Sequence, residues 1–171
     1  MIKAFAQFWN LCIFRSSPAQ VPSDNNALVV LLLITVGFSV LEALVLGAGS
    51  VWIFFAASFT TTVVVLAIIF FALHLRGFAA RFRKTLAAYL GTLAITNALS
   101  MIVVWLSTNN EVSGFLIAGF VIWRFAVIGF ILKHSMEISI IAGALIAFAC
   151  LIFASLVVIA LFPGAFAPVS S

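Results

Sequence analysis

The sequence predicts an all-α integral membrane protein: a polytopic bundle of five transmembrane helices, preceded by an amphipathic helix at the membrane interface. Two observations predict this fold class. Of the 171 residues, 66% are hydrophobic and 7% are charged, whereas a soluble domain carries about 25% charged residues. The apolar residues also gather in five long runs, and roughly 20 helical residues cross the ~30 Å hydrocarbon core of a bilayer.

Residues 1–20 are expected to form a lead-in that lies in the membrane interface. In a helix, Lys3, Gln7 and Asn10 fall on one narrow face and apolar residues cover the remainder, which is typical of an interfacial amphipathic helix. Gln7 and Asn10 also interrupt any apolar core of a signal peptide, so cleavage is not expected. The Ser-Ser-Pro sequence at 16–18 ends the helix.

The five apolar runs follow in order and form one transmembrane domain over 27–162. Turn-forming or charged residues separate them. The last run is followed by a short uncharged tail, residues 163–171. The predicted spans cover residues 27–46, 51–75, 85–106, 114–133 and 138–162.

The positions of lysine and arginine predict the orientation of the five spans. If the N-terminus is cytoplasmic, all of these residues outside the spans lie on the cytoplasmic side and none lies on the other: Lys3, Arg15, Arg76, Arg81, Arg83, Lys84 and Lys133. This distribution satisfies the positive-inside rule. We therefore expect a cytoplasmic N-terminus, an external C-terminus, and a location in a bacterial inner membrane.

The fourth span carries an arginine, Arg124, near its middle. A charge at that depth costs about 2.5–3.5 kcal/mol on insertion scales, so it requires a partner. Side chains lean toward the N-terminus of their own helix, which brings Arg124 and Glu42 of the first span toward the same level. We expect these two residues to form an ion pair. The predicted intramembrane polar core consists of Glu42, Thr61, Thr96, Asn97 and Arg124.

The third span carries a polar stripe, and two interpretations of it remain open. One is hydrogen bonding between helices, worth about 0.6 kcal/mol per bond. The other is a cavity for an ion or a small polar ligand. The first is favoured, because a self-neutralising ion pair leaves no net charge for an ion. The stripe consists of Thr85, Tyr89, Thr92, Thr96 and Ser100, with Asn97 beside it.

The fifth span carries a face of small residues that permits close approach of a neighbouring helix: Gly143, Ala147, Cys150 and Ala154. Cys150 is interpreted as a packing residue, and a disulfide with Cys12 is not expected because the two lie at different levels of the membrane. The two histidines, His74 and His134, are too few for a metal site, which needs three or four ligands. They are expected to bond water or lipid head groups.

The basic loop between the second and third spans is expected to contact anionic lipid through Arg76, Arg81, Arg83 and Lys84. Such contacts contribute about 1 kcal/mol per basic residue near the surface. Nucleic acid is not expected as a partner, since the membrane holds both ends of this loop. No nucleophile–base set, paired carboxylates or phosphate loop is visible, so we expect no enzyme activity, cofactor or metal.

Two segments resemble the Yip1-like family of small five-span membrane proteins in its compact prokaryotic form. They are FWNLCIFRSSPAQ (8–20), with an Arg-x-x-Pro ending, and WRFAVIGFILKHSMEIS (123–139), with a Lys-His-x-x-Glu opening to the last span. The Asp-Leu-Tyr-Gly-Pro motif of eukaryotic members is absent. The resemblance implies a scaffold or adaptor within a membrane and carries no catalytic residues.

Three functions are compatible with these features. The expected one is a membrane scaffold, adaptor or accessory subunit that packs against other membrane proteins or a second copy of itself. The alternatives are a small transporter or channel subunit that uses the polar layer, and an accessory lipid-modifying enzyme. Solvent access to Thr61 or Thr96 distinguishes the first two, because a conduit holds water and a tightly packed bundle does not.

Overall fold

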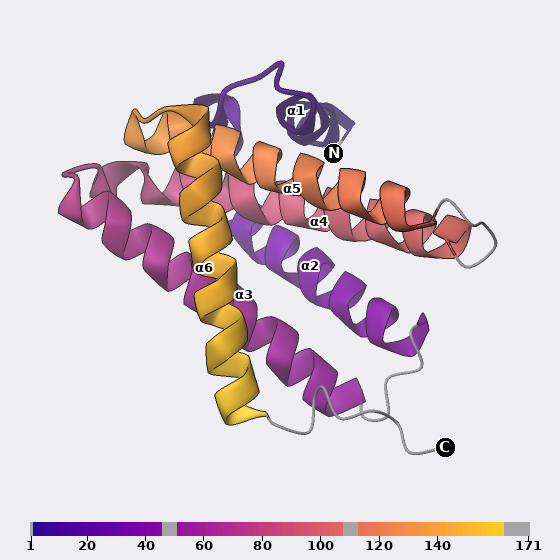
Figure 1. Ribbon diagram of the computed structural model, residues 1–171. Helices are drawn as coiled ribbons and strands as arrows, with labels where there is room; N and C mark the ends of the chain where they lie inside the picture. Colours follow the sequence, from indigo (N-terminus) through magenta and orange to yellow (C-terminus); the bar gives the residue numbers. More distant parts are fainter. Residues whose placement is uncertain (1, 46–50, 108–112, 163–171) are drawn as a thin grey trace, which may run out of the picture.

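The protein is all-helical over the residues described by the computed structural model, which are 2–45, 51–107 and 113–162. The prediction of an all-α fold is therefore confirmed. Figure 1 shows six α-helices in the described chain, with short 3-10 helices η1 (Pro18–Gln20) and η2 (Ala79–Arg81) between them. The α-helices are α1 (Ile2–Cys12), α2 (Asn25–Val45), α3 (Val51–Leu75), α4 (Phe82–Ser107), α5 (Ser113–Met136) and α6 (Ile140–Leu161).

Four helices of the described chain are long and apolar enough to cross a membrane. They cover Val51–Leu75, Ala79–Leu106, Gly114–Met136 and Ile140–Leu161, and α2 contains a shorter apolar stretch over Asn25–Leu41. The protein is therefore a membrane protein by the length and composition of its helices. The four long segments correspond to the second to fifth predicted spans.

The five long helices form a closed ring. Going round it, α2 packs against α3, α3 against α6, α6 against α5, α5 against α4, and α4 against α2. Helix α4 is the most enclosed, with 67% of its apolar segment buried, against 22% or less in α3, α5 and α6. These other three expose many large apolar side chains, as helices surrounded by lipid do.

Helices α5 and α6 approach each other closely at two glycines, Gly129 and Gly143. A Cβ atom built on Gly143 would lie 2.4 Å from the carbonyl oxygen of Gly129, and one on Gly129 would lie 2.7 Å from the backbone nitrogen of Ala144. The predicted small-residue face of the last span is buried as expected, at Gly143, Ala147, Cys150 and Ala154. Small residues allow the two backbones to approach closely, and van der Waals packing at such contacts helps to hold helices together in lipid.

Helix α1 lies across the outside of the ring, against α4 and α5 (Figure 1). The ring of Phe8 covers Gly91, where an added Cβ would lie 2.2 Å from it. The indole nitrogen of Trp123 donates to the Cys12 carbonyl oxygen at 3.2 Å. Trp123 lies about 15 Å along the helix from Lys133 by the rise per residue, so α1 contacts the middle of α5 rather than its end.

The sequence predicted a helix at the position of α1, but it did not predict that this helix packs against α4 and α5. It ends at Cys12, and Phe14 adopts a left-handed conformation with φ of 62° that turns the chain away. Gln7 and Asn10 of the predicted polar face are partly exposed, while the side chain of Lys3 lies outside the described residues. Phe8, Leu11 and Cys12 form the buried face.

We predict that Gly91→Ala undocks α1 and makes Cys12 reactive. Burial raises the pKa of the Cys12 thiol to about 12, so at pH 8 only about one thiol in ten thousand is the reactive thiolate. The added methyl group displaces the Phe8 ring, and the cysteine behind it becomes exposed. Maleimide labelling at pH 8 in a Cys150→Ala background measures this.

Gly37→Ala is the matched control, because an added Cβ at Gly37 meets nothing within 4 Å. Labelling of Cys12 should rise about tenfold or more in Gly91→Ala and stay at its starting rate in Gly37→Ala. Equal rates in the two variants would show that Phe8 does not hold α1 in place.

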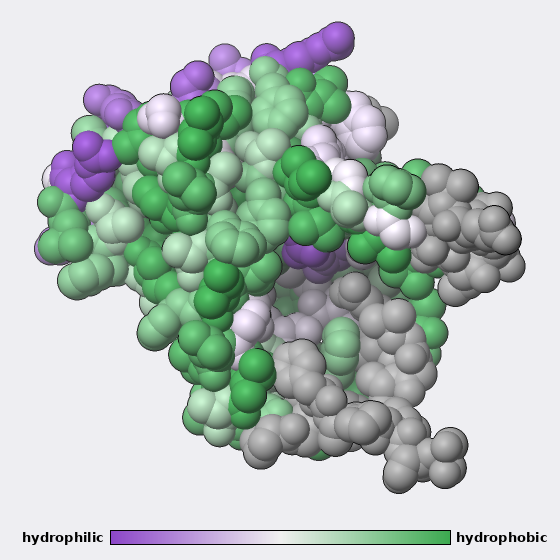
Figure 2. Space-filling view, viewed as in Figure 1, coloured by the Kyte–Doolittle hydropathy of each residue, from purple (hydrophilic) through white to green (hydrophobic). Residues whose placement is uncertain are grey.

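Charged side chains gather at one end of the ring, which we call the basic end. It comprises the segment 16–25 between α1 and α2, the loop 76–84 and the turn 133–139. Arg81 and Glu137 form an ion pair with 2.7 Å between Nη2 and Oε1. Figure 2 shows hydrophilic residues along the margin of the molecule where these segments lie, and a largely hydrophobic surface elsewhere on this face.

Candidate functional site

A cavity of about 260 Å³ lies inside the helix ring. Each of the five long helices contributes side chains to its wall. In the space-filling view the surface is hollowed between the helices, with hydrophilic atoms at the base of the hollow (Figure 2). The central cavity, as we call it, is the strongest candidate for a functional site because it combines a charged group with a partly open, concave space.

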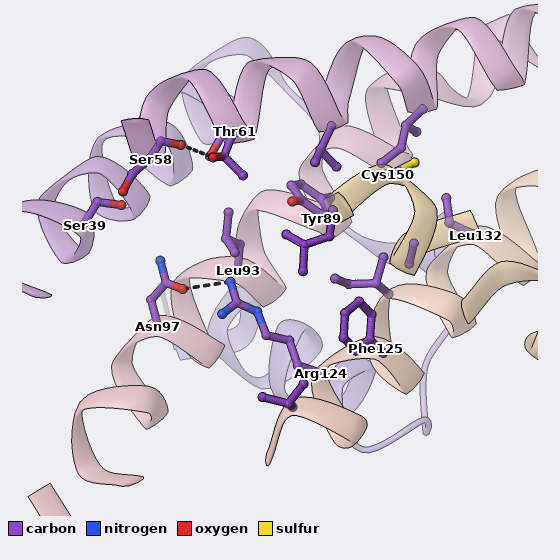
Figure 3. A pocket seen from close by; sticks show the side chains of 17 residues that line it. Ser39, Ser58, Thr61, Tyr89, Leu93, Asn97, Arg124, Phe125, Leu132 and Cys150 are labelled. Carbon is purple, nitrogen blue, oxygen red and sulfur yellow. Dashed lines mark hydrogen bonds between the residues drawn. The ribbon is translucent and has the colours of Figure 1, made fainter. Parts of the chain in front are cut away.

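One end of the central cavity is polar. Its side chains come from α2 (Ser39), α3 (Ser58, Thr61 and Thr62), α4 (Asn97) and α5 (Arg124). The Arg124 guanidinium donates through Nη2 to the Asn97 Oδ1 at 3.3 Å. Asn97 is buried and Arg124 is half-buried. Figure 3 shows the guanidinium extending toward Asn97, on the same side of the cavity as Ser39 and Ser58.

The hydroxyl groups at this end donate back to their own helices. Thr61 donates to the Ala57 carbonyl at 2.9 Å, and Thr62 to that of Ser58 at 3.0 Å. Ser39 donates to the Thr35 carbonyl at 3.2 Å. A hydroxyl that donates in this way keeps lone pairs free to accept. The polar end therefore offers hydroxyl acceptors and the donors of one guanidinium.

The other end of the central cavity is apolar and points toward the basic end. Its wall includes Ile69, Ile128 and Leu132, and Figure 3 shows Leu132 and Cys150 on the side away from Asn97. One turn further along their helices, Leu73 and Met136 are 0% and 1% exposed. These buried side chains close the cavity toward the basic end.

The structure brings together three of the five residues predicted for the polar core. Thr61, Asn97 and Arg124 all line the central cavity. Thr96 does not: it is 2% exposed, its hydroxyl donates to the Leu93 carbonyl, and it borders a separate gap of about 10 Å³. The side chain of Glu42 lies outside the described residues, so its ion pair with Arg124 stays a prediction.

The polar stripe of α4 faces the interior as predicted. Its members, Thr85, Tyr89, Thr92, Thr96, Asn97 and Ser100, are all buried. The hydroxyls of Thr92, Thr96 and Ser100 donate to carbonyls of α4 itself. Bonds between helices are made by Thr85, 2.8 Å from the Ser135 hydroxyl, and by Asn97. Most hydroxyl groups of the stripe therefore satisfy their hydrogen bonds within α4 and do not connect it to another helix.

Sequence reasoning placed Tyr89 on the polar stripe but missed two serines of the central cavity, Ser39 and Ser58. Ser58 precedes Thr61 and Thr62 by three and four positions, so it shares their helix face. That spacing could have identified it. Ser39 lies four positions after Thr35 and three before Glu42, so the same helical spacing could have identified it.

The basic residues predicted to contact lipid do not form one group. Arg81 and Lys84 line a recess at the basic end. Arg83 instead donates to the Asn25 side chain and to the Ser23 carbonyl, and Arg76 is exposed at the end of α3.

Among the residues that the structure describes, no three His, Cys, Asp or Glu side chains gather as metal ligands would. The His134 Nδ1 lies 2.9 Å from the Phe130 carbonyl oxygen. Cys12 and Cys150 are both free thiols.

No family model, curated protein or solved structure matches this chain, so the resemblance to the Yip1-like family stays a prediction and the central cavity carries the functional interpretation.

Proposed function

We propose that the protein is a small membrane transporter subunit that binds an amphipathic anion in the central cavity. The observation that supports this most is a half-buried guanidinium, that of Arg124, in a partly open cavity of about 260 Å³ inside a helix ring. Arginine stays protonated at any physiological pH, and charged groups at membrane depth generally mark substrate or ion pathways.

The chemistry of the cavity wall favours an anionic head group. A guanidinium has five N–H donors, and Asn97 accepts from one nitrogen of Arg124. The remaining donors suit the two oxygens of a carboxylate or phosphate ester. The hydroxyls of Thr61 and Ser58 lie on the same side of the cavity and can bind further polar groups of the ligand.

The apolar end favours a ligand with a hydrocarbon part. Ile69, Ile128 and Leu132 offer no hydrogen bonds, so a fully hydrophilic solute would leave polar groups unsatisfied there. An amphipathic anion would place its charge at Arg124 and its chain toward Leu132. Because Leu73 and Met136 are buried beyond that end, a carrier with one open side is a better description than a channel.

The proposal also includes a topology of five spans. Helix α2, with 21 residues, is about 31 Å long at 1.5 Å per residue, which suffices to cross a bilayer. The grouping of Arg81, Arg83, Lys84 and Lys133 at one end of the ring supports a cytoplasmic N-terminus by the positive-inside rule. The polar end of the cavity would open toward the outside of a bacterial inner membrane.

Cysteine labelling tests the proposal. In a background with Cys12→Ala and Cys150→Ala, Thr61→Cys is expected to react with a hydrophilic maleimide, because Thr61 lines the central cavity. Thr96→Cys is the matched control: it lies on the polar stripe at a similar depth but is 2% exposed and outside that cavity. We expect labelling at position 61 to be about tenfold faster.

Protection from labelling tests the ligand class. Octanoate should slow the reaction at Thr61→Cys, while octanol, with the same chain and no charge, should not. Arg124→Gln should remove the protection. If Thr61→Cys and Thr96→Cys both stay unlabelled, the interior is dry and the scaffold or adaptor role expected from the sequence replaces this proposal.

A further inference from the structure

We infer that the recess at the basic end is a specific site for the phosphate group of an anionic membrane lipid, distinct from the central cavity. The recess has a volume of about 350 Å³. It lies between η1, the start of α4 and the end of α5, and its wall is formed by Ser17, Pro18, Arg81, Lys84, His134 and Ser135 together with Ala19 and Thr85.

The groups around the recess are those that bind phosphate esters. Arg81 and Lys84 are one helical turn apart, so their cationic groups lie on one side. Lys84 uses one donor on the Ala19 carbonyl, at 3.1 Å, which leaves two of the three donors of an ammonium group. The Ser17 hydroxyl accepts from the Ala19 N–H and keeps its own proton to donate.

Arg81 is held in position for such a ligand. Its guanidinium lies 4.4 Å above the Phe78 ring centroid, and its Nη2 contacts Glu137 at 2.7 Å. A pre-oriented guanidinium loses little conformational entropy on binding an anion. The Glu137 carboxylate neutralises the charge of Arg81. The charge of Lys84 remains, so the recess carries a net positive charge.

The position along the helices identifies a lipid as the source of the phosphate. Thr85 and Ser135, at the inner wall of the recess, join α4 to α5 just where their apolar segments meet the charged loops. This is the level of lipid head groups for helices that cross a bilayer. The acyl chains of a lipid bound there would run along the exposed apolar side chains of the ring.

The matched control for this site is Arg76. It belongs to the same basic loop and is exposed, but it is not part of the recess wall. If anionic lipid were attracted by charge alone, Arg76→Gln and Lys84→Gln would weaken binding equally, because both remove one charge from the same loop. A specific site predicts a difference between them.

The experiment titrates the full-length protein in neutral detergent with dihexanoyl phosphatidylglycerol, dihexanoyl phosphatidylcholine or inorganic phosphate, by calorimetry. We expect Lys84→Gln to weaken the affinity for phosphatidylglycerol about tenfold and Arg76→Gln less than about twofold. Glutamine can still donate to the Ala19 carbonyl, so this variant removes the charge and keeps the internal bond. Lys84→Arg should retain binding, which shows that a loss is not a folding defect.

Three results would overturn the inference. Equal weakening in Arg76→Gln and Lys84→Gln means that attraction is diffuse. Binding of inorganic phosphate as tight as that of phosphatidylglycerol means that the ligand is a soluble phosphate. Equal binding of phosphatidylcholine means that the recess does not select charge. None of these results bears on the central cavity, whose residues are separate.

Discussion

Gly143→Val is expected to separate α6 from α5 and to destroy the central cavity. Even a single Cβ at this position would lie 2.4 Å from the Gly129 carbonyl oxygen, far inside van der Waals contact. The obstructing atoms are backbone atoms of a helix, so no side-chain rotation relieves the clash. Overpacking of a well-packed core typically lowers stability by about 1–3 kcal/mol. Valine adds two further methyl groups at a backbone contact, so we expect a loss of stability at the upper end of this range.

Gly119→Val is the matched control for this substitution. Gly119 lies on α5, and an added Cβ there meets nothing within 4 Å. It therefore carries only the small change in helix propensity, a few tenths of a kcal/mol. Thermal unfolding in detergent should show a clear loss for Gly143→Val and almost none for Gly119→Val.

The same pair of variants reports on the cavity. Arg124 and Phe125 reach its wall from α5, and Ala147 and Cys150 from α6. Separation of the two helices should therefore remove any octanoate protection of Thr61→Cys in Gly143→Val and preserve it in Gly119→Val. Identical melting of the two glycine variants would mean that the α5–α6 contact is not as close as the structure places it.

The sequence predicted the helices and the inward-facing polar residues better than it predicted which helices pack against each other. Long apolar runs mark helices because only hydrogen-bonded backbones can cross a bilayer. The polar stripe on α4 marked its inward face, and the side chains of the stripe are buried as expected. The length of an apolar run thus predicts a helix, and a polar residue within the run predicts which face of that helix points inward.

Packing partners could not be predicted because lipid is as apolar as the protein interior. Phe115 is 83% exposed while Phe8 is 5% exposed, and nothing in their local sequence distinguishes them. The docking of α1 on Gly91 and the closed order of the ring depend on such choices. The start of α4 also differs from the predicted start of the span. The helix begins at Phe82 and not at residue 85, because Arg83 and Lys84 continue the helix beyond its apolar part.

The central cavity is the feature that the sequence predicted least well. The stripe was interpreted mainly as bonding between helices, yet the hydroxyls of Thr92, Thr96 and Ser100 bond within α4. Whether polar side chains meet each other or an open space depends on how far apart the helices stand. On one side of the ring, Gly129 and Gly143 allow α5 and α6 to approach closely, and these positions are remote in sequence from the polar stripe.

Glu42→Gln and Arg124→Gln are each expected to destabilise the protein strongly, and the double variant to be more stable than the sum of the two losses. Removing one partner of a buried ion pair costs about 3–5 kcal/mol, since it leaves the other charge uncompensated. The double variant removes both charges and leaves two amides that can bond to each other or to Asn97. Unfolding of the four proteins of this cycle measures the coupling free energy.

Asn97→Asp provides a second check, which rests on a contact present in the structure. The Asn97 Oδ1 already accepts from Arg124 at 3.3 Å, so an aspartate there would hold a carboxylate against the guanidinium. In the Glu42→Gln background it should restore most of the lost stability, because Arg124 regains a counter-charge without a change in side-chain shape. Asn97→Ala in the same background lacks both charge and acceptor, and should lower stability further.

The outcome of this cycle also bears on the ligand. A ligand carboxylate and the Glu42 carboxylate would compete for one guanidinium, so Glu42→Gln should strengthen octanoate protection at Thr61→Cys if the protein still folds. Asn97→Asp should weaken it by occupying the same donors. Strictly additive losses in the cycle would show that Glu42 does not neutralise Arg124. In that case the guanidinium depends on Asn97 and on the bound anion for compensation, and the unliganded protein should be markedly less stable than the octanoate-bound one.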